Sequence, residues 1–437
     1  MLGVASAQTK PSIPEHTGVD TLPPQSSATK RRERVLLMMS GGVDSSVSAH
    51  ILQKQGYDVT GLYMHNWNHD QETQDETPSH PIHGQKGHSN IQNSTSTAAN
   101  VTVNGFTPRT AQVRPKVCTS DRDWADVQAV CSQLGIPARR LDFSRQYWNQ
   151  VFEIMLDGYR QGRTPNPDVS CNREIKFGKL IEWCQMNGGL GKDRPKEQLG
   201  SESSGGVVEY STENVSTQGW DYLATGHYAR VEIDPETGHA KLKRAHDSNK
   251  DQTYYLSTLP EKVLRHVLFP LAAIDKPIVK QIASQTGVQQ LENAAMKKES
   301  MGICFVGKRR RFGEFLQEYL EGDPGPVRVN SLNGPIIGQH KGLYQYTIGQ
   351  ASGVTNGSQK WVVLRPDLAS NTLIVVDGTQ NKRLFFPGLI AESWHWIAGH
   401  PPKKLAETSE STGNVTTDLF PFTAQIRHRQ VPRTLTM

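Results

Sequence analysis

The stretch LLMMSGGVDSSVSAH, residues 36–50, joins an apolar run to a turn of serine and glycine and then to a helix-like pattern. A strand, a turn of this kind and a helix together point several backbone N–H groups at one place, where the helix dipole favours an anion. The common nucleotide-binding loop ends in Gly-Lys-Ser/Thr, and its lysine reaches the β- and γ-phosphates. Residues 40–46 contain no lysine. The stretch therefore predicts a phosphate site of a different kind, and an ordinary tight turn is the alternative interpretation.

The alternation of strand and helix continues outward from this turn. Apolar runs of strand length alternate with amphipathic stretches, which is typical of an α/β, Rossmann-like domain with a doubly wound parallel sheet. The predicted strands cover residues 34–40, 58–67, 136–143 and 221–227, and the predicted helices cover 45–57, 121–135, 147–162 and 175–187. After residue 325 short strand-like runs, the last over 422–430, alternate with turn residues and predict a small all-β barrel.

These patterns divide the chain into four parts. We expect a disordered leader over 1–34, a catalytic domain over 35–265, a central domain over 266–335 and a C-terminal β-barrel over 336–437. Two polar stretches poor in aromatic residues, 68–112 and 187–218, have the composition of disordered inserts in the catalytic domain. Residues 292–310 are expected to return from the central part to the active site.

The composition narrows the class of protein. No run of eighteen apolar residues occurs, which argues against a membrane-spanning helix. The net charge of +5 is compatible with a polyanionic partner but is common among ordinary proteins. The five cysteines are scattered and odd in number, unlike a secreted disulfide framework, and their spacing predicts no metal site. Cys118, Cys131 and Cys184 are interpreted as small buried hydrophobic residues.

The segment GRTPNPDVSCNREIKFG, residues 162–178, carries several reactive groups in a short stretch stiffened by proline. Cys171 is expected to stand where a helix begins. The helix start, with Arg173 and Lys176, would favour its thiolate form, which makes it a candidate nucleophile. Asp168, three residues earlier, would then act as general acid or base. A capped helix start with a buried cysteine explains the same residues equally well.

A second cysteine of interest, Cys304, lies in KKESMGICFVGKRR, residues 297–310. Its apolar neighbours Ile303 and Phe305 favour a place in a hydrophobic core, whereas the nearby glycines and basic residues favour a reactive site. Together, Cys171 and Cys304 would suit a relay that passes sulfur as a persulfide.

The chain resembles a known family at these residues and at several more. SGGVDSS is similar to the PP-loop of the ATP pyrophosphatases, which cleave ATP between the α- and β-phosphates and need a cradle for pyrophosphate. The whole set of motifs, in the same order, resembles the tRNA-specific 2-thiouridylases (the MnmA/TRMU family). The other matching stretches are GLYMHNW (61–67), GRTPNPDVSCNREIKFG, ATGHYAR (224–230), DSNKDQTYYLSTL (247–259), ESMGICFVG (299–307) and GLYQYTIGQ (342–350).

This resemblance implies an enzyme that uses ATP, with Mg²⁺, to adenylate the C2 oxygen of wobble uridine 34 in certain tRNAs. A persulfide sulfur then displaces AMP and gives 2-thiouridine. By motif, Cys304 would hold the persulfide, Cys171 would be the nucleophile that frees the sulfur or forms a transient disulfide, and Asp168 would be the acid or base. The implied ATP site comprises Ser40, Gly41, Gly42, Val43, Asp44, Ser45, Ser46, Met64 and Gly226.

The resemblance also implies partners and a compartment. Asn166, Pro167 and Asp168 would touch the target uridine. Further tRNA contacts would come from Lys250, Asp251, Gln252, Arg427, Arg429 and Gln430. The sulfur would arrive from a persulfide donor charged by a cysteine desulfurase, and we expect a monomer without membrane contact. The leader and inserts favour a mitochondrial member, or a cytoplasmic one if residues 1–34 are no presequence.

This sequence departs from the family pattern at three places. Ala351 and Ser352 follow YTIGQ where the family usually has Arg-Lys, which removes two phosphate contacts. Glu299 stands where an aspartate usually precedes the serine before GICF. The barrel stops at QIRHRQVPRTLTM, where the family usually adds further strands, so we expect it to be incomplete with an open sheet edge.

Two other functions fit parts of the sequence. A PP-loop ligase of the asparagine or argininosuccinate synthetase type would adenylate a carboxylate or carbonyl and admit an amine. It would need neither Cys171 nor Cys304. A non-catalytic tRNA-binding remnant would bind RNA without releasing pyrophosphate from ATP.

Overall fold

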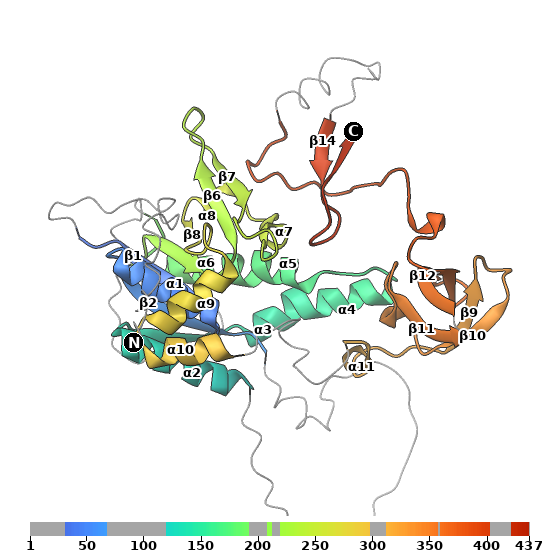
Figure 1. Cartoon of the computed structure of the whole chain (residues 1–437), viewed down its shortest axis with the longest axis horizontal. Helices are drawn as coiled ribbons and strands as arrows, with labels where there is room; N and C mark the ends of the chain where they lie inside the picture. The colour runs from blue at the N-terminus through green and yellow to red at the C-terminus, as the bar shows by residue number, and fades with distance from the viewer. Residues whose placement is uncertain are drawn as a thin grey trace, which may run out of the picture.

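The computed structural model describes residues 31–67, 119–191, 208–211, 219–297, 312–356, 359–402 and 421–436. Most of the expected leader, the insert 68–112 and the residues Cys118 and Cys304 lie outside these ranges. Figure 1 shows two parts rich in β-strands, with helix α4 (Glu153–Arg160) extending from the first toward the second. In the described ranges, no helix is long and apolar enough to cross a membrane.

The first part is built on a six-stranded sheet in the order β4-β3-β2-β1-β5-β8. The parallel strands are β1 (Arg34–Met39), β2 (Asp58–His65), β3 (Ala138–Asp142), β5 (Tyr222–Thr225) and β8 (Val267–Leu268). The edge strand β4 (Val208–Ser211) is antiparallel to β3 and comes from the second polar insert. The doubly wound α/β fold predicted from the sequence is confirmed.

This sheet is covered on both faces because its central strand is apolar on both faces. All six residues of β1 are buried. Val35 and Leu37 belong to one hydrophobic core, and Leu36 and Met38 to the other, as the alternation of a strand requires. The first core includes residues of α1 (Val43–Lys54), α2 (Thr119–Leu134), α9 (Lys276–Gln285) and α10 (Gln289–Met296).

The second core lies under one series of helical segments on the opposite face. These are α3 (Ser144–Tyr147), η3 (Trp148–Phe152), α4, α5 (Pro167–Cys171), η4 (Asn172–Lys179) and α6 (Leu180–Met186). The segments η3 and η4 have the wider π-type turn, a feature that often accompanies functional sites.

A hairpin that the sequence reading missed follows β5. It consists of β6 (Ala229–Ile233) and β7 (Ala240–Arg244), and the short helices α7 (Thr253–Leu256) and α8 (Glu261–Leu264) come next. The Asp234 carboxylate accepts the backbone N–H groups of Glu236 and Thr237, both at 3.0 Å, and so shapes the turn. The Asp-Pro pair at the start of this turn was a usable signal.

The second part is a five-stranded sheet in the order β10-β9-β13-β12-β11. Its elements are α11 (Phe312–Leu316), β9 (Gly325–Val329), β10 (Ile336–His340), η5 (Leu343–Gln345), β11 (Ala351–Asn356), β12 (Gln359–Asp367), β13 (Thr372–Asp377) and η6 (Lys382–Leu384). Val327, Val363 and Val375 fill its core. The predicted β-rich, barrel-like domain after residue 325 is confirmed.

The last described strands form a separate two-stranded sheet, β14 (Pro421–Ala424) and β15 (Arg433–Thr436). The predicted strand over 422–430 was wrong beyond Ala424. There the chain turns, because the Gln430 side-chain oxygen accepts the backbone N–H groups of Ile426 and Arg427 at 3.2 and 3.1 Å. In Figure 1 this hairpin stands beside α7, apart from the five-stranded sheet.

Candidate active site at the carboxyl end of the sheet

The strand order places a binding crevice beside β1. Along the chain, β2 pairs with one side of β1 and β5 with the other, so the connections leave toward opposite faces. Ligands of open α/β sheets bind at such a switch point, at the carboxyl ends of the strands. The turn 40–42 follows β1, and Gly226 and His227 follow β5. The fold therefore brings two of the quoted motifs together.

The turn 40–42 leaves the start of α1 open. Gly41 has φ +70°, and a Cβ there would lie 3.0 Å from the carbonyl oxygen of Asp123. Gly42 is the N-cap of α1 and offers no side chain to the first N–H groups of the helix. Those donors can then face an anion.

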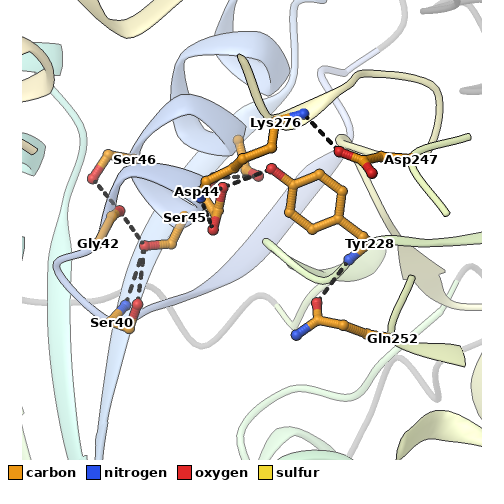
Figure 2. A network of polar contacts seen from close by, with 10 residues as sticks. Ser40, Gly42, Asp44, Ser45, Ser46, Tyr228, Asp247, Gln252 and Lys276 are labelled. Carbon is orange, nitrogen blue, oxygen red and sulfur yellow. Dashed lines mark hydrogen bonds and ion pairs between the residues drawn. The ribbon is translucent and has the colours of Figure 1, made fainter. Parts of the chain in front are cut away.

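The serines of the loop shape its backbone. Figure 2 shows the Ser45 and Ser46 hydroxyls donating to the carbonyl oxygen of Gly42 at 3.1 and 3.0 Å. The Ser45 oxygen also accepts the backbone N–H of Ser40 at 3.2 Å. In this arrangement the hydroxyl protons of Ser45 and Ser46 are committed to the loop itself. Met64, in the next-to-last position of β2, is half-buried and packs against the second core.

Asp44 is bound by groups from two distant segments. Its carboxylate accepts from Lys276 Nζ at 2.7 and 2.6 Å and from the Tyr228 hydroxyl at 2.8 Å. Gly42, not Asp44, is the N-cap of α1. The backbone N–H of Tyr228 is held by the Gln252 side-chain oxygen at 3.0 Å, as Figure 2 shows. Tyr228 thus links the loop to the segment 250–252.

His227 lies beside this loop as a neutral residue. Burial lowers the pKa of His227 well below its ordinary value, and the positive charge of Lys176 lowers it further. Its Nδ1 lies 2.8 Å from the Thr225 hydroxyl. His227 is therefore suited to hydrogen bonding rather than to carrying a charge.

The second motif forms a capped helix start, but Cys171 is not at that start. The Asn166 side chain caps α5 by accepting the N–H groups of Asp168 and Val169 at 3.2 and 3.3 Å, and Pro167 occupies the first turn. The expectation that the helix begins at Cys171 was wrong. Asn at the N-cap followed by Pro is a recognised start signal, so the sequence held the information.

Asp168 and Cys171 share one face of α5, being three residues apart. Burial raises the pKa of Asp168, while the charges of Lys176 and His428 oppose that rise. Cys171 is 6% exposed. A half-buried carboxyl group and a buried thiol therefore lie on the same helix face. The wider turn of η4 begins directly after Cys171.

One hydrogen bond connects the start of η4 with α7. The Asn172 amide nitrogen donates to the carbonyl oxygen of Tyr255 at 3.2 Å. Its Oδ1 is buried and accepts no hydrogen bond from the described residues. A buried acceptor of this kind commonly forms a hydrogen bond with water or with a ligand.

In the expected tRNA-binding segment 250–252, two of the three side chains form hydrogen bonds within the protein itself. The Asp251 carboxylate accepts the backbone N–H of Ala245 at 3.0 Å and the Thr253 hydroxyl at 2.8 Å, and Asp251 is buried. Gln252 holds Tyr228, as described above. In this arrangement Asp251 and Gln252 fix the segment, whereas Lys250 is half-buried.

The turn after β14 approaches α5 and α7. The Tyr254 hydroxyl donates to the carbonyl oxygen of Ile426 at 2.9 Å, and the His428 ring lies 4.6 Å from the Tyr255 ring. Arg427 donates to the carbonyl oxygen of Ile348 at 3.2 Å. Arg429 is exposed, with φ +64°. Sequence reasoning named both arginines and Gln430 but missed His428.

Sequence reasoning also missed Lys276 and Lys297. Lys297 Nζ donates to the carbonyl oxygen of Gly41 at 3.2 Å and forms an ion pair with Asp126. Cys304 lies outside the described residues and follows Lys297 by seven positions. The described residues 292–297 thus approach the loop, and the placement of 298–310 stays a prediction.

The described residues hold no cluster suited to a metal ion, meaning three or more His, Cys, Asp or Glu side chains. Their cysteines, Cys131, Cys171 and Cys184, are buried thiols without a disulfide. Burial raises the pKa of Cys131 to about 12 and raises that of Cys184 as well. Cys131 and Cys184 thus stay protonated at neutral pH, in line with their interpretation as core residues.

Comparison with known proteins agrees with this fold and with the family resemblance over most of the chain. The tRNA methyl transferase HUP domain model matches residues 33–104, 89–193 and 208–308, and the tRNA methyl transferase PRC-barrel domain model matches 313–377. The tRNA-specific 2-thiouridylase MnmA of Haemophilus influenzae (strain 86-028NP) is 38% identical over 380 residues, which are 86% of this chain and 78% of that protein.

Two further relatives bear the same name. The tRNA-specific 2-thiouridylase MnmA of Proteus mirabilis (strain HI4320) is 36% identical over 414 residues, 93% of this chain and 87% of that protein. The protein of this name from Limosilactobacillus reuteri (strain DSM 20016) is 38% identical over 375 residues, 85% of this chain and 78% of that protein. With a PP-loop at the switch point and this degree of identity, the chain belongs to the tRNA-specific 2-thiouridylase (MnmA) family.

Proposed function

We propose that this chain is a tRNA 2-thiouridylase that uses ATP to activate the wobble uridine and a persulfide to deliver sulfur. The observation that carries the proposal is the meeting of two motifs through one residue. Tyr228 contacts Asp44 of the PP-loop and is held by Gln252, in the segment that leads into α7 beside Cys171 and Asp168. The names of the relatives support the choice of tRNA as substrate.

In the activation step, the start of α1 would bind the phosphates of ATP. The uridine C2 oxygen attacks the α-phosphorus, and pyrophosphate leaves with the electrons of the broken P–O bond. The first N–H groups of α1 and the helix dipole stabilise the charge that develops on the leaving group. Gly226 allows the chain after β5 to lie close to this helix start.

Magnesium would enter bound to ATP rather than to a protein cage. Asp44, the carboxylate of the loop, already accepts three hydrogen bonds, which leaves little room for a metal on it. A magnesium ion bound to phosphate oxygens and water would supply positive charge at the phosphates.

In the sulfur step, Cys304 would carry a persulfide whose outer sulfur attacks C2 and displaces AMP. Cys171, as thiolate, then attacks the inner sulfur, which releases the 2-thiouridine sulfur and leaves a disulfide between the two cysteines. A thiol reductant restores both thiols with two electrons. Asp168 would move the proton near the base, because burial raises its pKa toward the working range.

The decisive experiment combines the full-length chain, ATP, a persulfide donor and unmodified tRNA, with 2-thiouridine at position 34 as the readout. We expect 2-thiouridine, AMP and pyrophosphate in equal amounts. Activity of a Cys171→Ser/Cys304→Ser double variant would instead favour an AMP-forming ligase. Binding of tRNA without pyrophosphate release would favour a non-catalytic remnant.

The partners and the compartment belong to the same proposal. We infer a sulfur donor charged by a cysteine desulfurase, a monomeric protein and a mitochondrial location. A fluorescent fusion of residues 1–40 tests the location, since a presequence would carry the fluorophore into mitochondria and a diffuse signal would contradict it. Light scattering of the purified chain measures its mass in solution and so tests whether it is a monomer.

A further inference from the structure

Lys276 reaches the PP-loop from a point 232 residues downstream of Asp44. It is the first residue of α9, and its own backbone N–H donates to the Asp247 carboxylate at 3.0 Å. Its Nζ lies 2.6 Å from one Asp44 oxygen and 2.7 Å from the other. Figure 2 shows the side chain running past the Tyr228 ring to the start of α1.

The position of this ammonium group is fixed by its surroundings. The Lys276 side chain is 8% exposed, whereas that of Asp44 is 34% exposed. Such a partly buried ion pair adds little to stability, because its charges lose part of their hydration. A pair kept at the ligand-binding edge of a sheet instead points to a role toward a charged ligand.

The loop itself needs a cation that its sequence does not contain. Pyrophosphate gains negative charge as it leaves, and residues 40–46 offer backbone N–H groups and hydroxyls but no lysine or arginine. Two of those hydroxyls are committed to Gly42, as described above. Lys276 places a positive charge at this helix start, where the common nucleotide-binding loop would use its own lysine.

We propose that Lys276 is the phosphate-binding lysine of this PP-loop, held in place by Asp44 until ATP arrives. Its ammonium group contacts the β- and γ-phosphate oxygens and stays with pyrophosphate as that group departs. Asp44 and Asp247 position it: the first holds Nζ and the second holds the start of α9. This inference rests on the proposed use of ATP.

Calorimetric titration of the full chain in EDTA tests the proposal with four ligands: adenosine, AMP, ATP and pyrophosphate. We expect Lys276→Met to weaken ATP and pyrophosphate binding by about 10- to 100-fold, the worth of one charge-assisted hydrogen bond, and to leave adenosine and AMP unchanged. Asp44→Asn frees the lysine and should keep or tighten pyrophosphate binding.

The double variant Asp44→Asn/Lys276→Met removes the pair without leaving a lone buried charge, so it stays informative if Lys276→Met fails to fold. We expect it to lose pyrophosphate affinity. Pyrophosphate binding equal to the wild type in the double variant, or an equal loss for adenosine, would show that Lys276 only balances Asp44 and would overturn the proposal. A wild-type chain that binds no ATP in a parallel titration with Mg²⁺ would instead refute the proposed function.

Discussion

Gly226, at the end of β5, lies directly against the backbone of Ser45 in the first turn of α1. A Cβ atom on Gly226 would stand 2.9 Å from Ser45 N and 3.0 Å from the carbonyl carbon of Asp44. Real Cβ atoms do not approach backbone so closely, so the two segments are in contact only because residue 226 has no side chain. The geometry of the loop 40–46 and of the proposed phosphate site therefore depends on this glycine.

Gly226→Ala should push the loop after β5 away from α1. Forced overpacking costs about 1–3 kcal/mol, so we expect a lower midpoint of thermal unfolding together with weaker ATP binding. Calorimetry and thermal unfolding measure the two effects. Gly388→Ala is the matched control, because nothing lies within 4 Å of a Cβ built there. Wild-type ATP affinity in Gly226→Ala would contradict the role given to this contact.

Cys171→Ser should separate activation from sulfur transfer. We expect pyrophosphate release with ATP and tRNA to persist, while formation of 2-thiouridine falls by at least about 10³-fold, as for loss of a covalent nucleophile. Mass spectrometry of digested tRNA measures the product. Cys131→Ala is the control, since the buried Cys131 thiol is protonated at neutral pH. Equal loss in both variants would mean that Cys171 is needed for folding alone.

Asp168→Asn should lower activity and raise stability at alkaline pH. Folding raises the pKa of Asp168, so the folded chain binds this proton more tightly than the unfolded chain. The resulting stabilisation is present at low pH and is lost as the pH rises through the raised pKa. Asparagine cannot ionise and avoids that loss, whereas a lost acid or base slows the reaction by about 10²- to 10⁴-fold.

The midpoint of thermal unfolding, followed from pH 4 to pH 8, checks the stability effect of Asp168→Asn. The variant should gain on the wild type as the pH rises, and the difference should shrink toward pH 4, near the ordinary pKa of aspartate, about 3.9. A variant less stable than the wild type at pH 8 would show that the Asp168 carboxylate is well solvated or well paired in the folded chain.

Gln430→Ala should loosen the turn after β14. The Gln430 side chain accepts two backbone N–H groups, and their loss would free Arg427 and His428 from their present positions. We expect tRNA affinity to fall by about tenfold, the worth of one or two hydrogen bonds, with ATP affinity unchanged. Gel-shift titrations measure the affinity for tRNA. Val431→Ala, at a side chain 71% exposed, is the neighbouring control and should bind tRNA normally.

The sequence was sufficient for four of the six strands of the first sheet. It missed the short strands β4 and β8, and β4 lies in a stretch expected to be disordered. Strand alternation and helical spacing are local patterns, and β1 obeys them strictly, with Val35 and Leu36 in opposite cores. The start of α5 was also readable, because Asn166 and Pro167 carry a known capping signal.

Contacts between segments that are distant in the sequence could not be predicted from such local patterns. Lys276 stands in a stretch with no motif of its own, and His428 stands among named residues without a signal of its own. Both matter because folding brings them to Asp44 and Tyr255. The turn at 425–430 was misread for a related reason. Ile426 continues the apolar alternation of Phe422 and Ala424 and so resembles part of a strand, and the Gln430 hydrogen bonds that form the turn have no local signature.

The contact of Lys297 with Gly41 has a consequence for the proposed transfer of sulfur from Cys304. Cys304 follows Lys297 by seven residues, so chain connectivity alone keeps it within about 25 Å of that lysine. A group on so short a tether has an effective concentration in the millimolar range near its target. The sulfur step would then be intramolecular, with a rate per molecule that does not change when the protein is diluted.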